Sequence, residues 1–301
     1  MNTSDFKKKK RSGGRGPLIR KVLTVLLIAA IVIFIGKTAF DRFFPFEFEP
    51  SVSLDFQNAD ATLLDKLFKE DNCYPAFNGE VQCYMEENAT IGPRGLVLRA
   101  EYVGNDPNGD PIITSGRVDT RTFFYKACGK YEVEASFPSG VGVFAAIWLR
   151  EPDWLQSNKS LKNPAINVAE YQGGWADILH FNLHTDLSLS RTDVKSRSKS
   201  VKIGNLPDTF HTYGIEWTKS SIRYLVDGTV LYTIENNGDW IKGPTEMIFN
   251  LAMGGTWAES IADRRGLETW HGVQLTQPGQ TWEMVVTNMR YYPLRDPDSC
   301  N

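Results

Sequence analysis

The number of cysteines in the chain predicts disulfide bonds. Cys73, Cys83, Cys128 and Cys300 form an even set, and such a set in an exported chain predicts disulfides. Three pairings are possible. Cys73–Cys83 with Cys128–Cys300 is favoured, the first pair because it closes a short loop, and unpaired buried thiols are the alternative. No CxxC spacing occurs, so a zinc cluster is not expected.

A second set of residues has side chains that suit sugar binding. Aromatic faces stack on the apolar face of a pyranose, and polar groups between them orient its hydroxyls. For each tryptophan the alternative is packing in a core or at its rim, and Trp217 is expected to be such a core residue. The candidates are Trp148, Trp154, Tyr171, Trp175 and Trp257, with Asn182 and His184 as hydrogen-bonding partners.

Strands must position these residues, because the chain shows period-2 alternation with turn residues between the segments. No stretch of helical period and useful length appears beyond the N-terminal segment. Many evenly spaced strands predict an all-β fold with two packed antiparallel sheets. The expected strands are Lys130–Phe137, Phe210–Trp217, Met247–Met253 and Glu283–Tyr292, together with a hairpin at 222–234 that turns at Asp227-Gly228.

The charge is distributed unevenly along the chain. Residues 1–40 hold nine basic side chains and one acidic one, a net charge of +8. The overall charge of −3 therefore leaves −11 for the remaining 261 residues. A main body of that sign is not expected to bind nucleic acid or another polyanion.

The basic N-terminus precedes an apolar run. Residues 22–36 form a stretch of 15 without a charge, roughly 23 Å as a helix against the ~30 Å hydrocarbon core. Leu18, Ile19 and Phe40 lengthen it if the flanking basic side chains snorkel. A cleaved signal peptide is the alternative. The prediction is a cytoplasmic disordered tail at 1–17, a transmembrane signal anchor at 18–40, a juxtamembrane stalk at 41–50 and an extracytoplasmic domain at 51–296.

Six segments, in order, resemble glycoside hydrolase family 16. The resemblance implies a β-jelly roll of two antiparallel sheets, whose concave cleft binds β-linked glucan or galactan and needs no cofactor. Members often bind calcium through an Asp of the final strand; Thr287 takes that place here, so no metal is expected. The segments are 114–121 (TSGRVDTR), 129–135 (GKYEVEA), 141–149 (VGVFAAIWL), 210–217 (FHTYGIEW), 224–228 (YLVDG) and 249–257 (FNLAMGGTW).

The catalytic strand of that family reads Glu-x-Asp-x-x-Glu. A β-bulge brings both outer carboxylates to one face, where retaining hydrolysis needs them about 5–5.5 Å apart. The matching strand here is AINVAEY. By position Glu170 is the acid/base, Asn167 replaces the Asp, and Ala165 replaces the nucleophile; the other register puts Ile166 there. Two neighbouring carboxylates would repel a negative charge on Glu170 and so help to keep it protonated. Without them, Glu170 is a doubtful general acid.

The same resemblance bears on the binding candidates. Trp154 and Trp257 match positions that line the family's cleft, and His184 resembles its cleft histidine, although a lone histidine is more often structural. The roles of Arg150 and Glu151 cannot be assigned from the sequence.

Three functions remain open after the sequence. The first is a surface-displayed, non-hydrolytic protein that binds β-linked polysaccharide. The second is a glycoside hydrolase in which Glu170 is the acid and Asp177, Glu151 or Asp153 activates water, at roughly 6.5–9.5 Å in an inverting geometry. The third is an envelope scaffold without a ligand. The missing nucleophile favours the first of these.

Overall fold

The computed structural model describes residues 16–73, 78–152, 164–184, 196–235, 241, 243–296 and 300. The chain forms two compact units, Met1–Pro45 and Phe46–Asn301. Residues 41–50, predicted as a stalk, divide between these units. Of the predicted tail at 1–17, all but the last two residues lie outside the described part of the chain.

The first unit contains the helix α1 (Gly16–Phe43). This helix covers the segment that the sequence predicted to cross a membrane. Among the described residues, however, no helix combines the length and the apolar character of a membrane span. The transmembrane prediction is therefore not supported. The uncharged run at its centre has 15 residues, roughly 23 Å of helix against a hydrocarbon core of about 30 Å.

The larger sheet of the second unit has ten strands. β1 pairs with β17, β4 pairs with β5, and the remaining eight strands form one path. In order along that path they are β15 (Thr229–Glu235), β14 (Ser221–Val226), β13 (Phe210–Trp217), β8 (Gly129–Ser136), β17 (Thr281–Tyr292), β5 (Gly95–Asn105), β6 (Pro111–Ser115) and β3 (Gln82–Tyr84), with β1 at Val52–Asp55 and β4 at Ala89–Gly92.

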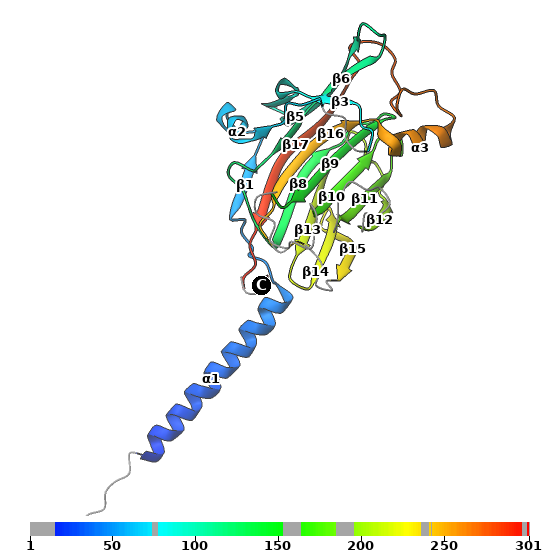
Figure 1. Ribbon diagram of the computed structural model, residues 1–301. Coiled ribbons are helices and arrows are strands. Elements are labelled where there is room, and N and C mark those ends of the chain that lie inside the picture. The colour runs from blue at the N-terminus through cyan, green and yellow to red at the C-terminus, as the bar shows by residue number, and fades with distance from the viewer. Residues whose placement is uncertain are drawn as a thin grey trace, which may run out of the picture. The chain divides into compact units, whose positions relative to one another are not determined.

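The smaller sheet has seven strands and carries the candidate site. Its central strands β10, β9 and β16 are antiparallel neighbours. Figure 1 shows β10, β11 and β12 following one another at one side of this sheet. The strand order is β12 (Ser196–Lys202), β11 (Ile178–His184), β10 (Ala165–Gln172), β9 (Val143–Arg150), β16 (Glu246–Met253), β7 (Arg117–Asp119) and β2 (Phe68–Lys69).

The core lies between the two sheets, because each contributes its alternate apolar residues to one cluster. β8 buries Tyr131, Val133 and Ala135 there, as the alternation predicted. Trp217 is 1% exposed in the same cluster, which confirms its prediction as a core residue. The all-β prediction, with two packed sheets and a hairpin turning at 227–228, is confirmed. The sheets are not wholly antiparallel as predicted, because β3 pairs with β6 in parallel.

The sequence missed a helix that follows β16. α3 (Gly255–Arg265) buries Ala258, Ile261 and Ala262, and it ends where Gly266 takes a left-handed conformation. Its apolar positions span little more than one turn, too few for a visible helical period. Two shorter helical segments, α2 (Ala61–Lys66) and the 3₁₀ turn η1 (Glu86–Asn88), lie in the N-terminal part of the unit.

Both disulfides form as the favoured pairing predicted. Cys73 bonds Cys83, and Cys128 bonds Cys300. The first closes the loop that leads into β3. The second ties the end of the chain to the start of β8 across 172 residues of sequence, and a closed loop of this length restricts the unfolded chain strongly.

Candidate functional site

β10 brings the three positions of the predicted catalytic strand to one face. Ala165 and Asn167 share a face by alternation. The register against β9 shifts between Asn167 and Ala169, which marks the predicted β-bulge. The extra residue returns Glu170 to the same face, whereas Ile166 packs in the core. Ala165 therefore lies on the same face as Glu170, at the position that the sequence predicted for the nucleophile. We call the side of the seven-stranded sheet that carries Ala165, Asn167 and Glu170 the Glu170 face.

Glu170 lies in a nearly closed environment, with 6% of its surface exposed. Asn167 Nδ2 donates to its Oε1 at 2.6 Å, and Asn182 Nδ2 donates to its Oε2. Burial raises the pKa of Glu170 to about 7, although both amides oppose this shift. The structure does not support the expectation that Glu170 is a doubtful general acid once its neighbouring carboxylates are gone, because a carboxyl group with a pKa of about 7 keeps a large protonated fraction at neutral pH.

A Glu170→Gln variant is expected to be more stable than the parent at high pH. The carboxyl pKa rises from 4.5 to about 7 on folding, so the folded state holds its proton more tightly. The free energy of unfolding of the parent is highest below pH 4.5, and it falls by roughly 3 kcal/mol as the pH rises to about 7. Glutamine carries no such dependence. Urea unfolding at pH 5 and pH 8 measures the effect; an equal difference between the two proteins at both pH values would contradict it.

Ala165 presents a methyl group where a nucleophile would stand. It is 1% exposed and pairs with Arg150 of β9 and His184 of β11. A methyl group cannot attack an anomeric carbon, and Asn167 beside it has an amide in place of an acid. These two side chains do not supply the second carboxylate that retaining hydrolysis uses.

Trp148 lies on this face beside Asn167, its register partner. Its Nε1 donates to Asn250 Oδ1 at 2.8 Å. The guanidinium of Arg117 stands 5.4 Å from its ring and that of Arg150 5.9 Å from it. Trp148 is thus a partly buried aromatic side chain that a hydrogen bond orients and whose ring has two guanidinium groups near it.

The rings of Trp257 and Trp175 both lie near His180, a residue that the sequence analysis did not identify as a candidate. Their ring centroids lie 4.6 and 6.2 Å from that of His180. His180 is the register partner of Glu170 on β11, so both tryptophans belong beside Glu170. Burial lowers the pKa of His180 to about 4, which keeps it neutral. Its neighbour on the same face, His184, has its pKa lowered to about 4 for the same reason.

Tyr171 is not a binding residue, contrary to the prediction. It follows Glu170 on the strand and therefore points to the opposite side, where it is fully buried. Its ring stacks on Phe137 with centroids 5.6 Å apart, inside the core. Trp154 lies outside the described residues.

Two of the carboxylates predicted to act beside Glu170 have other partners. Glu151 is 1% exposed and accepts a hydrogen bond from Gly243 N at 2.7 Å. Asp177 forms an ion pair with Lys202 at 2.9 Å. Asp153 lies outside the described residues.

The sequence analysis missed a carboxylate, Glu80, that affects the pKa of Glu170. Glu80 precedes β3 and accepts hydrogen bonds from Asn78 Nδ2 at 2.5 Å and Gln82 Nε2 at 3.0 Å. Its negative charge raises the pKa of Glu170, and burial raises the pKa of Glu80 itself. No local pattern marks Glu80, because 90 residues of sequence separate it from Glu170. Its segment reaches the smaller sheet through a backbone bridge to Gly254, just after β16.

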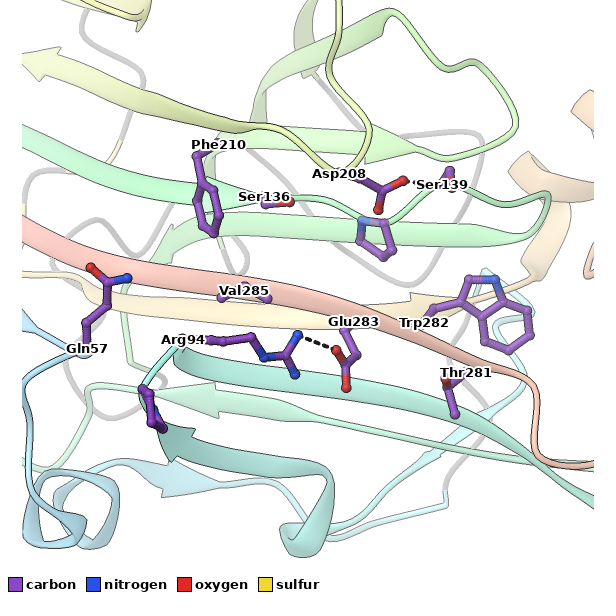
Figure 2. Close-up of a pocket in the computed structure, with 12 residues that line it drawn as sticks. Gln57, Arg94, Ser136, Ser139, Asp208, Phe210, Thr281, Trp282, Glu283 and Val285 are labelled. Carbon is purple, nitrogen blue, oxygen red and sulfur yellow. Dashed lines mark hydrogen bonds and ion pairs between the residues drawn. The ribbon is translucent and has the colours of Figure 1, made fainter.

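A pocket of about 530 Å³ lies elsewhere, on the outer side of the ten-stranded sheet (Figure 2). Its floor includes Ser136 and Val285, and Arg94 and Glu283 form an ion pair at its edge. Phe210, 46% exposed, stands at its rim. These residues come from the other sheet and are separate from the Glu170 face.

Known proteins resemble this chain in both sequence and structure. A β-glucanase of Rhodothermus marinus is 31% identical over 195 residues, 60% of this chain and 66% of the relative. A β-1,3-glucan-binding protein of Penaeus monodon is 24% identical over 148 residues, 44% of this chain and 38% of the relative. The chain thus spans less than two thirds of either relative. The laminarinase structure from R. marinus superposes with a TM-score of 0.66 at 26% identity, covering 83% of this chain and 99% of that one.

The family assignment follows from these similarities and from the strand geometry. The model of glycosyl hydrolases family 16 matches residues 77–273, which include the bulged strand β10 and the segment around Glu80. With that match over more than half of its length and the jelly-roll fold shared with the laminarinase, this chain belongs to glycosyl hydrolases family 16.

Proposed function

We propose that this protein binds a β-linked glucan on the Glu170 face and does not carry out the retaining hydrolysis of its family. The observation that carries the proposal is the methyl group of Ala165 at the nucleophile position, 1% exposed and on the same face as Glu170. The jelly-roll fold and the polar side chains of the Glu170 face, among them Asn167 and Glu170, surround Ala165.

The composition of the face supports a neutral, hydroxyl-rich ligand. Trp148, Trp175 and Trp257 offer aromatic surface. The amide of Asn250 accepts a hydrogen bond from Trp148, and that of Asn182 donates one to Glu170. Such a mixture suits pyranose rings better than a charged ligand. A relative from P. monodon bears the name of a β-1,3-glucan-binding protein, which supports glucan as the class of ligand.

We further propose that the domain is exported. Two disulfides in a chain of this size favour an oxidising compartment, and the basic N-terminus followed by an apolar helix is typical of a segment that directs export. Retention of the domain at a membrane stays a separate prediction. Carbonate extraction of cells that express the full chain tests it: the intact protein is expected to remain with the membranes, and its release would contradict retention.

Binding can be tested on residues 46–301, since these form a compact unit. Titration with soluble β-1,3- and mixed-linkage glucans is expected to show saturable binding. Trp257→Ala should weaken it about tenfold, the equivalent of roughly 1.4 kcal/mol for one lost aromatic contact. Phe210→Ala is the matched control, because that exposed ring lies on the other sheet.

The control separates the proposed site from general adhesion to polysaccharide. Equal weakening by both variants would place binding outside the Glu170 face. No binding to any glucan would favour the scaffold function and overturn the proposal.

A further inference from the structure

Gln172, the last residue of β10, has a buried amide group without a partner. It lies on the Glu170 face, because it follows Tyr171, whose side chain points into the core. The side chain of Gln172 is fully buried, yet neither its Nε2 nor its Oε1 has a hydrogen-bond partner among the residues that the structure describes. An unpaired buried amide lowers the stability of a fold, and such groups are rare unless a ligand or water completes them.

A second unpaired polar atom lies on the neighbouring strand. His180 of β11 is the register partner of Glu170 and shares its face. Its Nδ1 forms a hydrogen bond with Ser200 Oγ at 2.8 Å, whereas its buried Nε2 has no partner within the described part of the chain. Gln172 and His180 are diagonal neighbours on the two strands, roughly 7–8 Å apart. One pyranose unit placed between them can therefore reach both groups.

The ring of Trp257 covers this part of the face. Its centroid lies 5.5 Å from that of Phe144 and 4.6 Å from that of His180, with an edge-on arrangement in both pairs. Phe144 is the register partner of Gln172 on β9, and His180 is that of Glu170 on β11. The ring thus extends over β10 from one neighbouring strand to the other, above the unpaired amide.

The helix that carries Trp257 is anchored to the turn that follows β10. Arg265 Nη1 donates to Gly174 O at 2.9 Å, and a Cβ at Gly174 would meet Ile261 Cγ2 at 2.8 Å. The helix therefore packs closely against this turn. Trp257 itself is only half-buried, so its side chain can change rotamer while the helix stays in place.

We propose that Gln172 and His180 bind the hydroxyl groups of one glucose unit beside Glu170, in a subsite that Trp257 covers in the free protein. This inference rests on the glucan binding proposed above. The amide of Gln172 offers a donor and an acceptor, which suit one hydroxyl that accepts and one that donates, and His180 Nε2 pairs with a further hydroxyl. On binding, the ring of Trp257 turns away from the strands and stacks on the apolar face of the same glucose unit.

The test compares Gln172→Met with the parent on residues 46–301, with a soluble mixed-linkage β-glucan oligosaccharide as the ligand. Methionine is unbranched like glutamine and lacks the amide. The Kd should rise about tenfold, the equivalent of roughly 1.4 kcal/mol, because hydrogen bonds to the sugar are lost. The Tm of the free protein should rise by about 2–4 °C, because no unpaired amide remains buried.

Gln82→Met is the matched control for stability. Gln82 is also buried, but both ends of its amide are paired: Nε2 donates to Glu80 Oε2 at 3.0 Å, and Oε1 accepts from Met253 N at 2.8 Å. The Tm of this variant should fall. The opposite signs of the two shifts distinguish an amide that binds a ligand from one that stabilises the fold.

The outcomes separate this inference from glucan binding. An unchanged Kd for Gln172→Met, or a fall in its Tm as large as that of Gln82→Met, would overturn the subsite and leave glucan binding intact. Absence of binding by the parent would overturn both proposals. If Gln172→Met gives no folded protein, NMR of the parent decides: the side-chain amide signals of Gln172 should shift when the oligosaccharide is added, and unchanged signals would overturn the subsite.

Discussion

Replacing Ala165 by glutamate and Asn167 by aspartate is expected to give the protein retaining hydrolysis of β-glucan. The bulge of β10 already places both positions on one face with Glu170, and the pKa of Glu170, about 7, suits a general acid. Position 165 pairs with Arg150, whose positive charge favours an ionised nucleophile. The gain should be at least about 100-fold over the parent, the lower end of what one positioned carboxylate contributes.

Product configuration identifies the new activity. The double variant should release β-configured ends, which NMR distinguishes from the α-configured ends of a single displacement. Ala165→Gln with Asn167→Asp is the matched control, because it fills the same volume without a nucleophile. If the double variant binds glucan but does not hydrolyse it with retention, residues outside the catalytic strand must also differ from those that the reaction requires.

Glu246→Gln is expected to destabilise the domain by about 3–5 kcal/mol, as for removal of one partner of a buried ion pair. Glu246 is 1% exposed, and its Oε1 accepts from Arg150 Nη2 at 2.7 Å and Arg150 Nε at 3.2 Å. A second guanidinium, that of Arg121, lies 3.7 Å from Oε2. Glutamine removes the buried anion that pairs with Arg150, whereas Arg121 keeps its ion pair with Asp119 at 2.6 Å.

Urea unfolding at pH 7 measures this loss. Arg94→Ala is the control, because the Arg94–Glu283 pair at the edge of the pocket in Figure 2 is largely exposed and should contribute less than about 1 kcal/mol. A loss for Glu246→Gln no larger than that of the control would show that solvent reaches the buried pair.

The sequence was sufficient for the features that depend on local pattern. Alternation identified β8, because a strand with one buried face repeats every two residues. The segments of β13, β16 and β17 were also expected as strands. The Asp227-Gly228 pair marked a hairpin by its turn chemistry. The motif strand predicted that Ala165, Asn167 and Glu170 share a face, because the bulged spacing fixes which three residues do so.

The tertiary structure decided what depends on distant residues. The environment of Glu170 could not be predicted, because its pKa follows from burial under segments remote in sequence. Tyr171 was misplaced, since the sequence marks an aromatic side chain but the bulge decides its face. His180, Asn250 and Glu80 carried no local signal. Only the tertiary structure places Glu80, which precedes β3 of the ten-stranded sheet, where its charge acts on Glu170 of the seven-stranded sheet.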